Sequence, residues 1–185
     1  MNQLDKAQYL AEKAHAGQTR KNSDEPYAEH PKRVARILQE AGFPDAVIIA
    51  GYLHDTVEDT EVTPAVIEEQ FGPDVARLVA AHTENKTLSW EERKEHTIQT
   101  VKEGPMEVKA LIVADKLDNL QALQKHYEEQ GSRVWDAFKR GREKQAWYNQ
   151  SIADAIKDIP QPPAFFKQYI DLVETFFGDR PDKSM

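Results

Sequence analysis

The chain has 185 residues, contains no cysteine, and carries a formal net charge of −8 from 24 basic and 32 acidic residues. A chain of this length can bury a substantial core, so we predict a single domain over residues 1–185. The lack of cysteine excludes disulfides, thiolate nucleophiles, iron–sulfur clusters and cysteine-ligated zinc, and leaves His, Asp and Glu to hold any metal. The acidic balance argues against a broad surface for nucleic acid or anionic membranes.

No stretch of the sequence is suited to a signal peptide or to a membrane span. We therefore expect a cytoplasmic protein without a membrane partner. The acidic balance does not exclude one phosphorylated small molecule bound at a local basic spot. The sequence leaves open whether the chain forms a homo-oligomer.

Apolar residues recur at helical spacing, and glycine and proline fall mainly between the periodic runs, so we predict an all-α fold. Thr63 and Ser89 stand in N-cap patterns, the second of them a capping box with Glu92. The first two helices are separated by a polar loop that is basic at Arg20 and Lys21. The predicted helices cover residues 4–16, 31–41, 45–59, two short runs after Thr63, one run from Ser89, and residues 106–129, 132–156 and 163–177.

The helix over 45–59 is apolar nearly all round until it reaches the polar run HDTVED at residues 54–59. If these residues stay helical, His54 stacks on Glu58, and Asp55 stacks on Asp59, four residues apart on one broad face. Carboxylates crowded beside an apolar helix are unfavourable unless a cation compensates them. The run therefore predicts a divalent metal, and Asp115, which follows the apolar run Leu-Ile-Val-Ala, is expected to join it.

A site of imidazoles and carboxylates without sulfur suits manganese, iron, cobalt, nickel or zinc better than calcium. The ligand types alone do not choose among these metals. The remaining histidines, at positions 15, 82, 96 and 126, show no spacing that calls for a metal, and we leave them out of the metal shell.

An ordered set of motifs runs along the chain: Arg20-Lys21, Pro26-Tyr27, His30-Pro31, HDTVEDT and ADKLDNL. This set resembles the hydrolase domain of RelA/SpoT proteins and the small alarmone hydrolases of the HD type, including the metazoan SpoT homologue. The resemblance implies a helical HD-domain bundle and hydrolysis of the 3′-pyrophosphate of ppGpp or pppGpp, giving GDP or GTP and pyrophosphate.

By that resemblance, His30, His54, Asp55 and Asp115 would hold one manganese ion, while Glu58 and Asp59 would position and deprotonate the attacking water. Arg20 and Lys21 supply the positive charge that a diphosphate requires. The predicted substrate-binding residues are Arg20, Lys21, Lys86, Asn119, Lys144 and Tyr148.

Two other functions stay open at this point. The chain is also compatible with an HD-type nucleotidase or nucleotide pyrophosphatase that acts on another phosphorylated small molecule. It is compatible, too, with a catalytically silent module that senses a nucleotide, although the intact Glu58-Asp59 pair speaks against that function.

Overall fold

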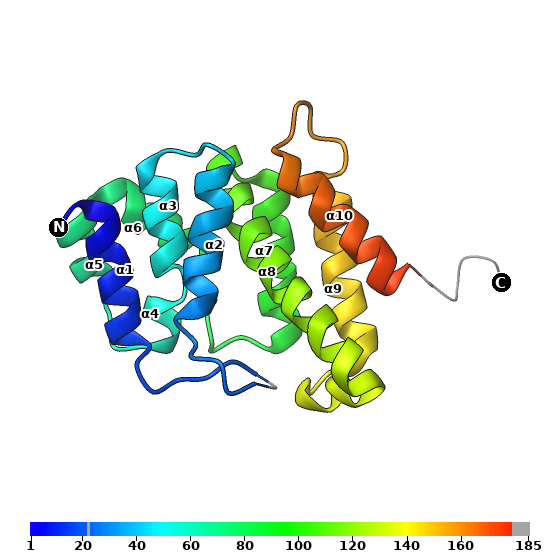
Figure 1. The fold of residues 1–185 in the computed structure, drawn as a ribbon. Coiled ribbons are helices and arrows are strands. Elements are labelled where there is room, and N and C mark those ends of the chain that lie inside the picture. The colour runs from blue at the N-terminus through cyan, green and yellow to red at the C-terminus, as the bar shows by residue number, and fades with distance from the viewer. Residues whose placement is uncertain (22, 179–185) are drawn as a thin grey trace.

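The computed structural model describes residues 1–21 and 23–178, and these form a bundle of helices without a named β-strand. Figure 1 shows α1, α2 and α3 side by side at one end of the bundle and α9 and α10 at the other. The elements are α1 (Gln3–Ala14), α2 (Glu29–Glu40), α3 (Asp45–Leu53), α4 (Thr56–Asp59), α5 (Pro64–Phe71), α6 (Pro73–His82), α7 (Trp90–Glu103), α8 (Met106–Gln130), the 3₁₀ helix η1 (Gly131–Ala137), α9 (Gly141–Ile156) and α10 (Ala164–Phe177).

Local sequence signals set most helix starts. The Asn2 side chain accepts a hydrogen bond from the Asp5 N–H at the start of α1, and Thr63 caps α5 in the same way. The predicted capping box between Ser89 and Glu92 is present at α7, with both of its hydrogen bonds formed. Pro31 lies in the first turn of α2, where its missing N–H leaves no helical bond unmade. The all-α prediction is confirmed.

The predicted helix over 45–59 is wrong, because α3 ends at Leu53 and a separate short helix, α4, begins at Thr56. Two side chains cause the break. The His54 ring nitrogen Nδ1 lies 2.7 Å from the Gly51 carbonyl oxygen, and the Thr56 hydroxyl donates to the Leu53 carbonyl at 2.8 Å. These carbonyls would otherwise accept the backbone N–H groups that continue the helix, so the side chains compete with it.

The predicted helix over 132–156 is also wrong at its start. Residues 131–137 form η1, and α9 begins only at Gly141. Gly131 and Gly141 have φ of 66° and 72°, a left-handed conformation that glycine adopts without a steric cost. The two glycines thus separate α8, η1 and α9.

One continuous cluster of buried apolar side chains runs through the bundle. The long helix α8 packs against α2, α3, α6, α7 and α10, so it joins the two ends of the bundle. The continuous core supports a single domain, and the single domain stays a prediction. Residues 22 and 179–185 of its predicted range lie outside the described residues. Within the described part of the chain, none of the helices combines the length and apolarity that a membrane span requires.

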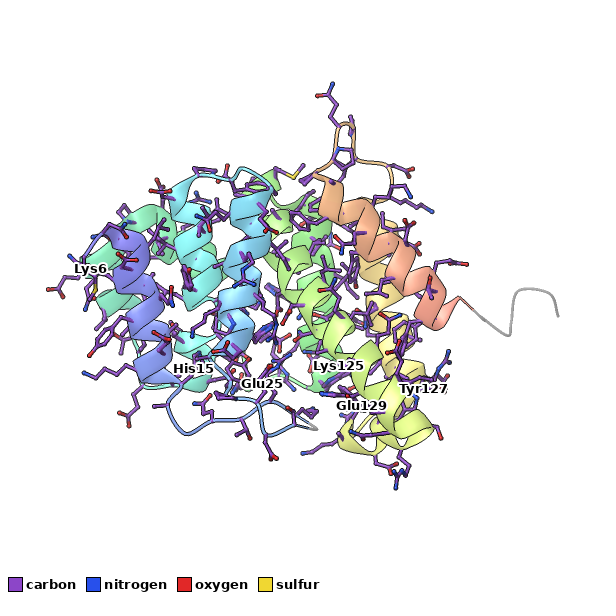
Figure 2. All side chains as sticks on the ribbon, viewed as in Figure 1. Lys6, His15, Glu25, Lys125, Tyr127 and Glu129 are labelled. Atoms are coloured by element: carbon purple, nitrogen blue, oxygen red, sulfur yellow. The ribbon has the colours of Figure 1, made fainter. Side chains whose placement is uncertain are left out.

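The loop between α1 and α2, residues 17–21 and 23–28, is called the Arg20 loop here. Its backbone is held by hydrogen bonds from Arg20 N to the Glu25 carbonyl and from Tyr27 N to the Gln18 carbonyl. It runs past the lower ends of α1 and α2, where Figure 2 labels His15 and Glu25. The loop therefore borders the same end of α2 that carries His30.

The helices α2 and α3 approach each other closely at Gly51. A Cβ added to Gly51 would lie 3.0 Å from Leu38 Cδ1 and 3.1 Å from the Ala35 Cα. In an exposed helix Gly→Ala stabilises by roughly 1 kcal/mol, whereas overpacking a core costs about 1–3 kcal/mol. The difference is a net cost of up to about 2 kcal/mol, so we expect Gly51→Ala to lower the Tm by up to about 8 °C, measured by thermal unfolding.

The exposed substitution Gln39→Ala on α2 is the matched control, and it should leave the Tm nearly unchanged. A Gly51→Ala protein that melts at or above the wild-type temperature would contradict the close packing of α2 on α3.

Candidate metal centre

Four predicted metal ligands meet at one point in the bundle. His30 comes from the first turn of α2, His54 and Asp55 from the break between α3 and α4, and Asp115 from the middle of α8. One ligand atom from each residue can be chosen so that all four atoms lie within 4.8 Å of one another, and all four residues are buried. The structure thus gathers side chains that lie up to 85 positions apart in the sequence.

Hydrogen bonds fix the orientation of both imidazoles. His54 Nδ1 faces the Gly51 carbonyl at 2.7 Å, and His30 Nδ1 faces Asp118 Oδ2 at 2.7 Å. Because a carbonyl and a carboxylate only accept, each Nδ1 must carry the proton. The two Nε2 atoms lie 3.2 Å apart and, in the neutral rings, present lone pairs to each other.

The two carboxylates add further acceptors at the same point. Asp115 Oδ1 is 2.8 Å from His30 Nε2, and Asp55 Oδ2 is 3.0 Å from His54 Nε2. Burial alone would lower the pKa of His54, but Asp55 and Asp115 raise it well above its usual value. Four acceptor atoms facing one another require a positive charge among them, and two imidazoles with two carboxylates are a donor set that fits a divalent transition metal.

Other residues also contact the two carboxylates. The Tyr27 hydroxyl donates at 2.5 Å to Asp55 Oδ2, the same oxygen that faces His54 Nε2. The second oxygen of Asp115, Oδ2, lies 3.0 Å from both Lys116 Nζ and His82 Nε2. Burial, followed by the nearby Asp55 carboxylate, raises the pKa of Tyr27 far above its usual value, so its hydroxyl remains a donor. These contacts hold the carboxylates with an oxygen turned toward the histidines.

Glu58 and Asp59 line a cavity of about 610 Å³ beside the four ligands, together with Asp55, Asp115 and Lys116. Glu58 Oε1 accepts the Glu84 N–H at 2.8 Å, which fixes this carboxylate. Burial raises the pKa of Glu58 above its usual value, a shift that favours proton acceptance near neutral pH. The cavity therefore places two further carboxylates next to the predicted ligands, one of them held by a backbone N–H.

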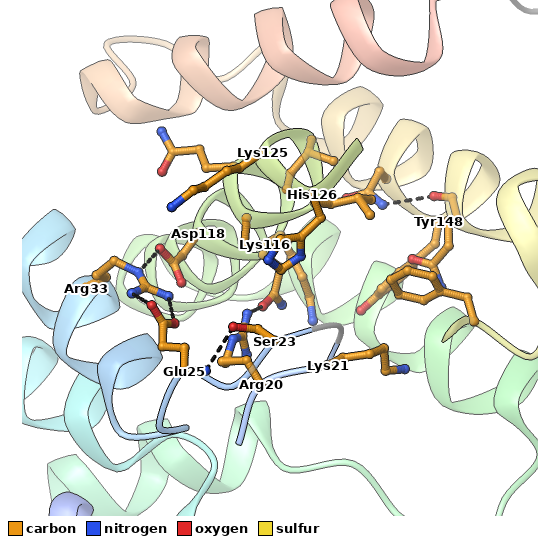
Figure 3. Close-up of a pocket in the computed structure, with 18 of the residues that line it drawn as sticks. Arg20, Lys21, Ser23, Glu25, Arg33, Lys116, Asp118, Lys125, His126 and Tyr148 are labelled. Atoms are coloured by element: carbon orange, nitrogen blue, oxygen red, sulfur yellow. Dashed lines mark hydrogen bonds and ion pairs between the residues drawn. The ribbon is translucent and has the colours of Figure 1, made fainter. Parts of the chain in front are cut away.

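A second cavity of about 560 Å³ adjoins the first, and the two share Arg20, Lys21, Lys94, Lys116 and Asn119 in their walls. Figure 3 shows Lys116 in the middle of this cavity and Arg20 and Lys21 on the loop that closes one side. Burial, helped by Lys139 and Arg20, lowers the pKa of Lys21, as expected where cations gather. An anionic group is therefore favoured at the boundary between the cavities.

The six predicted substrate-binding residues differ in where they lie relative to the two cavities. Arg20, Lys21 and Asn119 line both cavities, and Tyr148 lines the second one. Lys86 stands outside both walls and forms an ion pair with Asp59 at 3.0 Å. Lys144 is exposed above the Trp147 ring and lies outside both walls, so the structure gives its predicted role no support.

Two residues at the centre had no role in the sequence-based assignment. Asp118 contacts His30, and it lies on α8 one turn from Asp115, a spacing that a helical reading of ADKLDNL could have used. His82, left out of the metal shell, is not one of the four converging ligands, but it contacts Asp115 and stacks edge-on against His54. It lies 33 positions before Asp115, and no local spacing connects the two.

A family model of the HD domain matches residues 7–143. The chain belongs to the HD-domain family. This membership agrees with the resemblance in the motifs and with the all-α bundle.

Several named proteins are similar to this HD-domain chain. The human guanosine-3′,5′-bis(diphosphate) 3′-pyrophosphohydrolase MESH1 is 44% identical over 124 residues, which cover 65% of this chain and 69% of that protein. The guanosine-3′,5′-bis(diphosphate) 3′-pyrophosphohydrolase of Aquifex aeolicus is 36% identical over 136 residues, which cover 71% of this chain and 19% of that protein.

Two solved structures have the same fold. The crystal structure of lmo0812 from Listeria monocytogenes EGD-e matches with a TM-score of 0.77 and 53% identity, covering 84% of this chain and 98% of that one. The structure of a metazoan ortholog of SpoT that hydrolyses ppGpp matches with a TM-score of 0.79 and 29% identity, covering 96% and 97%.

Metal binding at the four ligands should stabilise the fold, because a ligand that binds only the native state adds stability by mass action. At a concentration about 100 times its Kd, Mn²⁺ is expected to raise the Tm of chelator-treated protein by about 5–10 °C. His54→Gln should remove most of this shift, and the exposed His96→Gln should keep it.

The readout is the difference between the Tm values with and without Mn²⁺, so it is independent of any destabilisation by the substitution itself. An undiminished shift in the His54→Gln protein would place the bound ion elsewhere.

Proposed function

We propose that the chain is a metal-dependent guanosine-3′,5′-bis(diphosphate) 3′-pyrophosphohydrolase, which hydrolyses ppGpp or pppGpp to GDP or GTP and pyrophosphate. The observation that carries this proposal is the junction of two cavities, one acidic and lined by two of the four predicted metal ligands, Asp55 and Asp115, and one lined by cations. Relatives with this activity in their names, and a structural neighbour that hydrolyses ppGpp, support the same substrate. The cytoplasmic location stays a prediction.

In this proposal His30, His54, Asp55 and Asp115 hold one divalent ion, and we propose manganese. When bound, the ion supplies Lewis-acid activation of water and of phosphoryl oxygens. The protein contributes fixed ligand directions, through Asp118 on His30 and Gly51 on His54. The proposal of manganese rests on the family resemblance, since the ligand types also suit iron, cobalt, nickel and zinc.

Glu58 and Asp59 are proposed to orient the attacking water and to take its proton. The water oxygen forms a bond to the phosphorus next to the ribose 3′-oxygen, and the bond between that phosphorus and the 3′-oxygen breaks. The 3′-oxygen leaves with a proton as a hydroxyl, and the diphosphate leaves intact. The fixed position of Glu58 on the Glu84 N–H, and its raised pKa, suit a general base.

The cationic cavity is proposed to hold the remaining part of the nucleotide. Arg20, Lys21, Lys94 and Lys116 supply positive charge at the boundary of the cavities, where the 3′-diphosphate would lie. Tyr148 offers an aromatic ring in the wall of the second cavity for the sugar or the base. This arrangement accounts for a small-molecule anion as partner despite the net charge of −8.

The proposed reaction is tested by pyrophosphate release from ppGpp in the presence of Mn²⁺. Glu58→Gln is expected to lower kcat by about 10²–10⁴-fold with little change in ppGpp affinity, because it removes a proton acceptor and keeps the shape of the side chain. The exposed Glu61→Gln, on the same segment, serves as the control and should keep wild-type kcat.

Turnover of a different nucleotide by metal-loaded protein that leaves ppGpp intact would instead identify a nucleotidase of the HD type. Binding of ppGpp without turnover would identify a sensing module.

Substrate binding should depend on the Arg20 guanidinium. Charge-assisted hydrogen bonds contribute about 1.5–3 kcal/mol, so Arg20→Met is expected to lower kcat/KM for ppGpp by about ten- to a hundredfold, mainly through KM. Lys13→Met, an exposed basic residue on α1, is the control. Steady-state kinetics in which KM stays at the wild-type value would remove Arg20 from the binding site.

A further inference from the structure

The Arg20 loop contacts the metal centre through several side chains. The Gln18 amide donates to the Asp59 carbonyl at 3.0 Å, and the Tyr27 hydroxyl donates to Asp55. Arg20 donates to Asn119 Oδ1 at 2.8 Å, and the Asn119 amide in turn lies 3.3 Å from Asp115 Oδ1. The loop that borders the cationic cavity is therefore attached to groups on and next to the predicted metal ligands.

One further path from this loop leads to a metal ligand through three charged residues. Arg33 Nη2 and Nη1 donate to the two carboxylate oxygens of Glu25, at 2.8 and 3.1 Å. The Arg33 Nε donates to Asp118 Oδ1 at 2.7 Å, and Asp118 Oδ2 accepts from His30 Nδ1 at 2.7 Å. Figure 3 shows Arg33 between Glu25 and Asp118, with dashed lines to both. We call Glu25, Arg33 and Asp118 the relay.

Burial changes along the relay from the loop to the metal centre. The Glu25 and Arg33 side chains are about one-third exposed, at 35% and 33%, while Asp118 is only 4% exposed. A buried carboxylate with one oxygen on a guanidinium and the other on an imidazole has both of its acceptors used. The guanidinium is planar and always charged, so a bidentate pair at one edge and a bond from Nε fix its orientation.

The relay holds the loop, and it also orients the imidazole ring of His30. Asp118 determines which nitrogen of His30 carries the proton and thereby directs the Nε2 lone pair toward the other three ligands. Arg33 holds Asp118 in place, and Glu25 holds Arg33 from the loop. A continuous series of hydrogen bonds thus joins the Arg20 loop to the ring of His30.

We propose that Glu25, Arg33 and Asp118 are positioning residues that couple the Arg20 loop to His30, so that the metal and the nucleotide each bind more tightly when the other is present. The nucleotide half of this inference rests on the proposed function, whereas the link from Arg33 to the metal does not. Coupling between two ligands is reciprocal, so each must change the affinity of the other by the same factor.

Calorimetric titrations test the relay with Mn²⁺ and with GDP, the product of ppGpp hydrolysis in the proposed reaction. Mn²⁺ is titrated into metal-free protein with and without saturating GDP, and GDP is titrated with and without Mn²⁺. For the wild type we expect each ligand to raise the affinity of the other by the same factor, about fivefold or more.

Two variants divide the relay into its parts. Arg33→Met releases Asp118, and it is expected to lower the Mn²⁺ affinity about tenfold or more without any nucleotide present. Glu25→Gln leaves Arg33 on Asp118 and alters only the loop end, so it should keep the Mn²⁺ affinity within about twofold and lose most of the coupling factor. A residue that merely fastened the loop would not lower the Mn²⁺ affinity in the absence of nucleotide.

The control is Lys32→Met on the same helix, because Lys32 pairs with Glu12 and Glu29 and takes no part in the relay. Wild-type Mn²⁺ affinity in the Arg33→Met protein would overturn the link to His30, and an unchanged coupling factor in the Glu25→Gln protein would overturn the link to the loop. If the Arg33→Met protein fails to fold by circular dichroism, Asp118→Asn takes its place, with the same expected direction.

Failure of the relay and failure of the proposed function give different results. If the wild-type protein releases pyrophosphate from ppGpp but shows no coupling between Mn²⁺ and GDP, the proposed function stands and the proposed coupling through the relay is refuted. If the wild-type protein binds no GDP, both the coupling and the proposed nucleotide site are refuted. The Mn²⁺ affinity of the Arg33→Met protein still tests the link to His30.

Discussion

The structure depends on one electrostatic constraint, the convergence of two imidazole nitrogens and two carboxylate oxygens on a single buried point. Acceptor atoms in such a place repel one another unless a cation lies between them. The four predicted ligands come from α2, the end of α3 and α8, so these three helices must pack within fixed distances. The close contact between α2 and α3 at Gly51 contributes to this packing, and Gly51 lies three residues before His54 in the sequence.

The break after α3 shows how fold and chemistry meet in the same residues. His54 and Thr56 take carbonyls of the last helical turn, and this both ends the helix and fixes the imidazole. The sequence could single out the four residues that converge, because polar side chains in apolar surroundings mark His54, Asp55 and Asp115, and the ordered set of motifs adds His30. It could not predict the break, because helical periodicity carries no information about side chains that compete for backbone carbonyls.

The same limit applies to the partners of the ligands. Most helices, the capping box and the all-α class follow from local signals, as at Ser89 and Thr63. The contact of His82 with Asp115 joins residues of α6 and α8, and it appears only once the bundle is packed. The break between α8 and α9 depends on two glycines with positive φ, which a sequence reading takes as ordinary interruptions. Tertiary packing therefore decides what local patterns leave open.

The shared wall of the two cavities has a consequence for inhibitor chemistry. Five residues line both cavities: Arg20, Lys21, Lys94, Lys116 and Asn119. One small molecule that reaches into both cavities could therefore place a metal-chelating group in the first and an aromatic group in the second. Joining two weak fragments raises the effective concentration of the second at its own site. The distance between the two cavities then determines the length of the linker. Compounds of this kind would distinguish this chain from enzymes that share only the metal ligands.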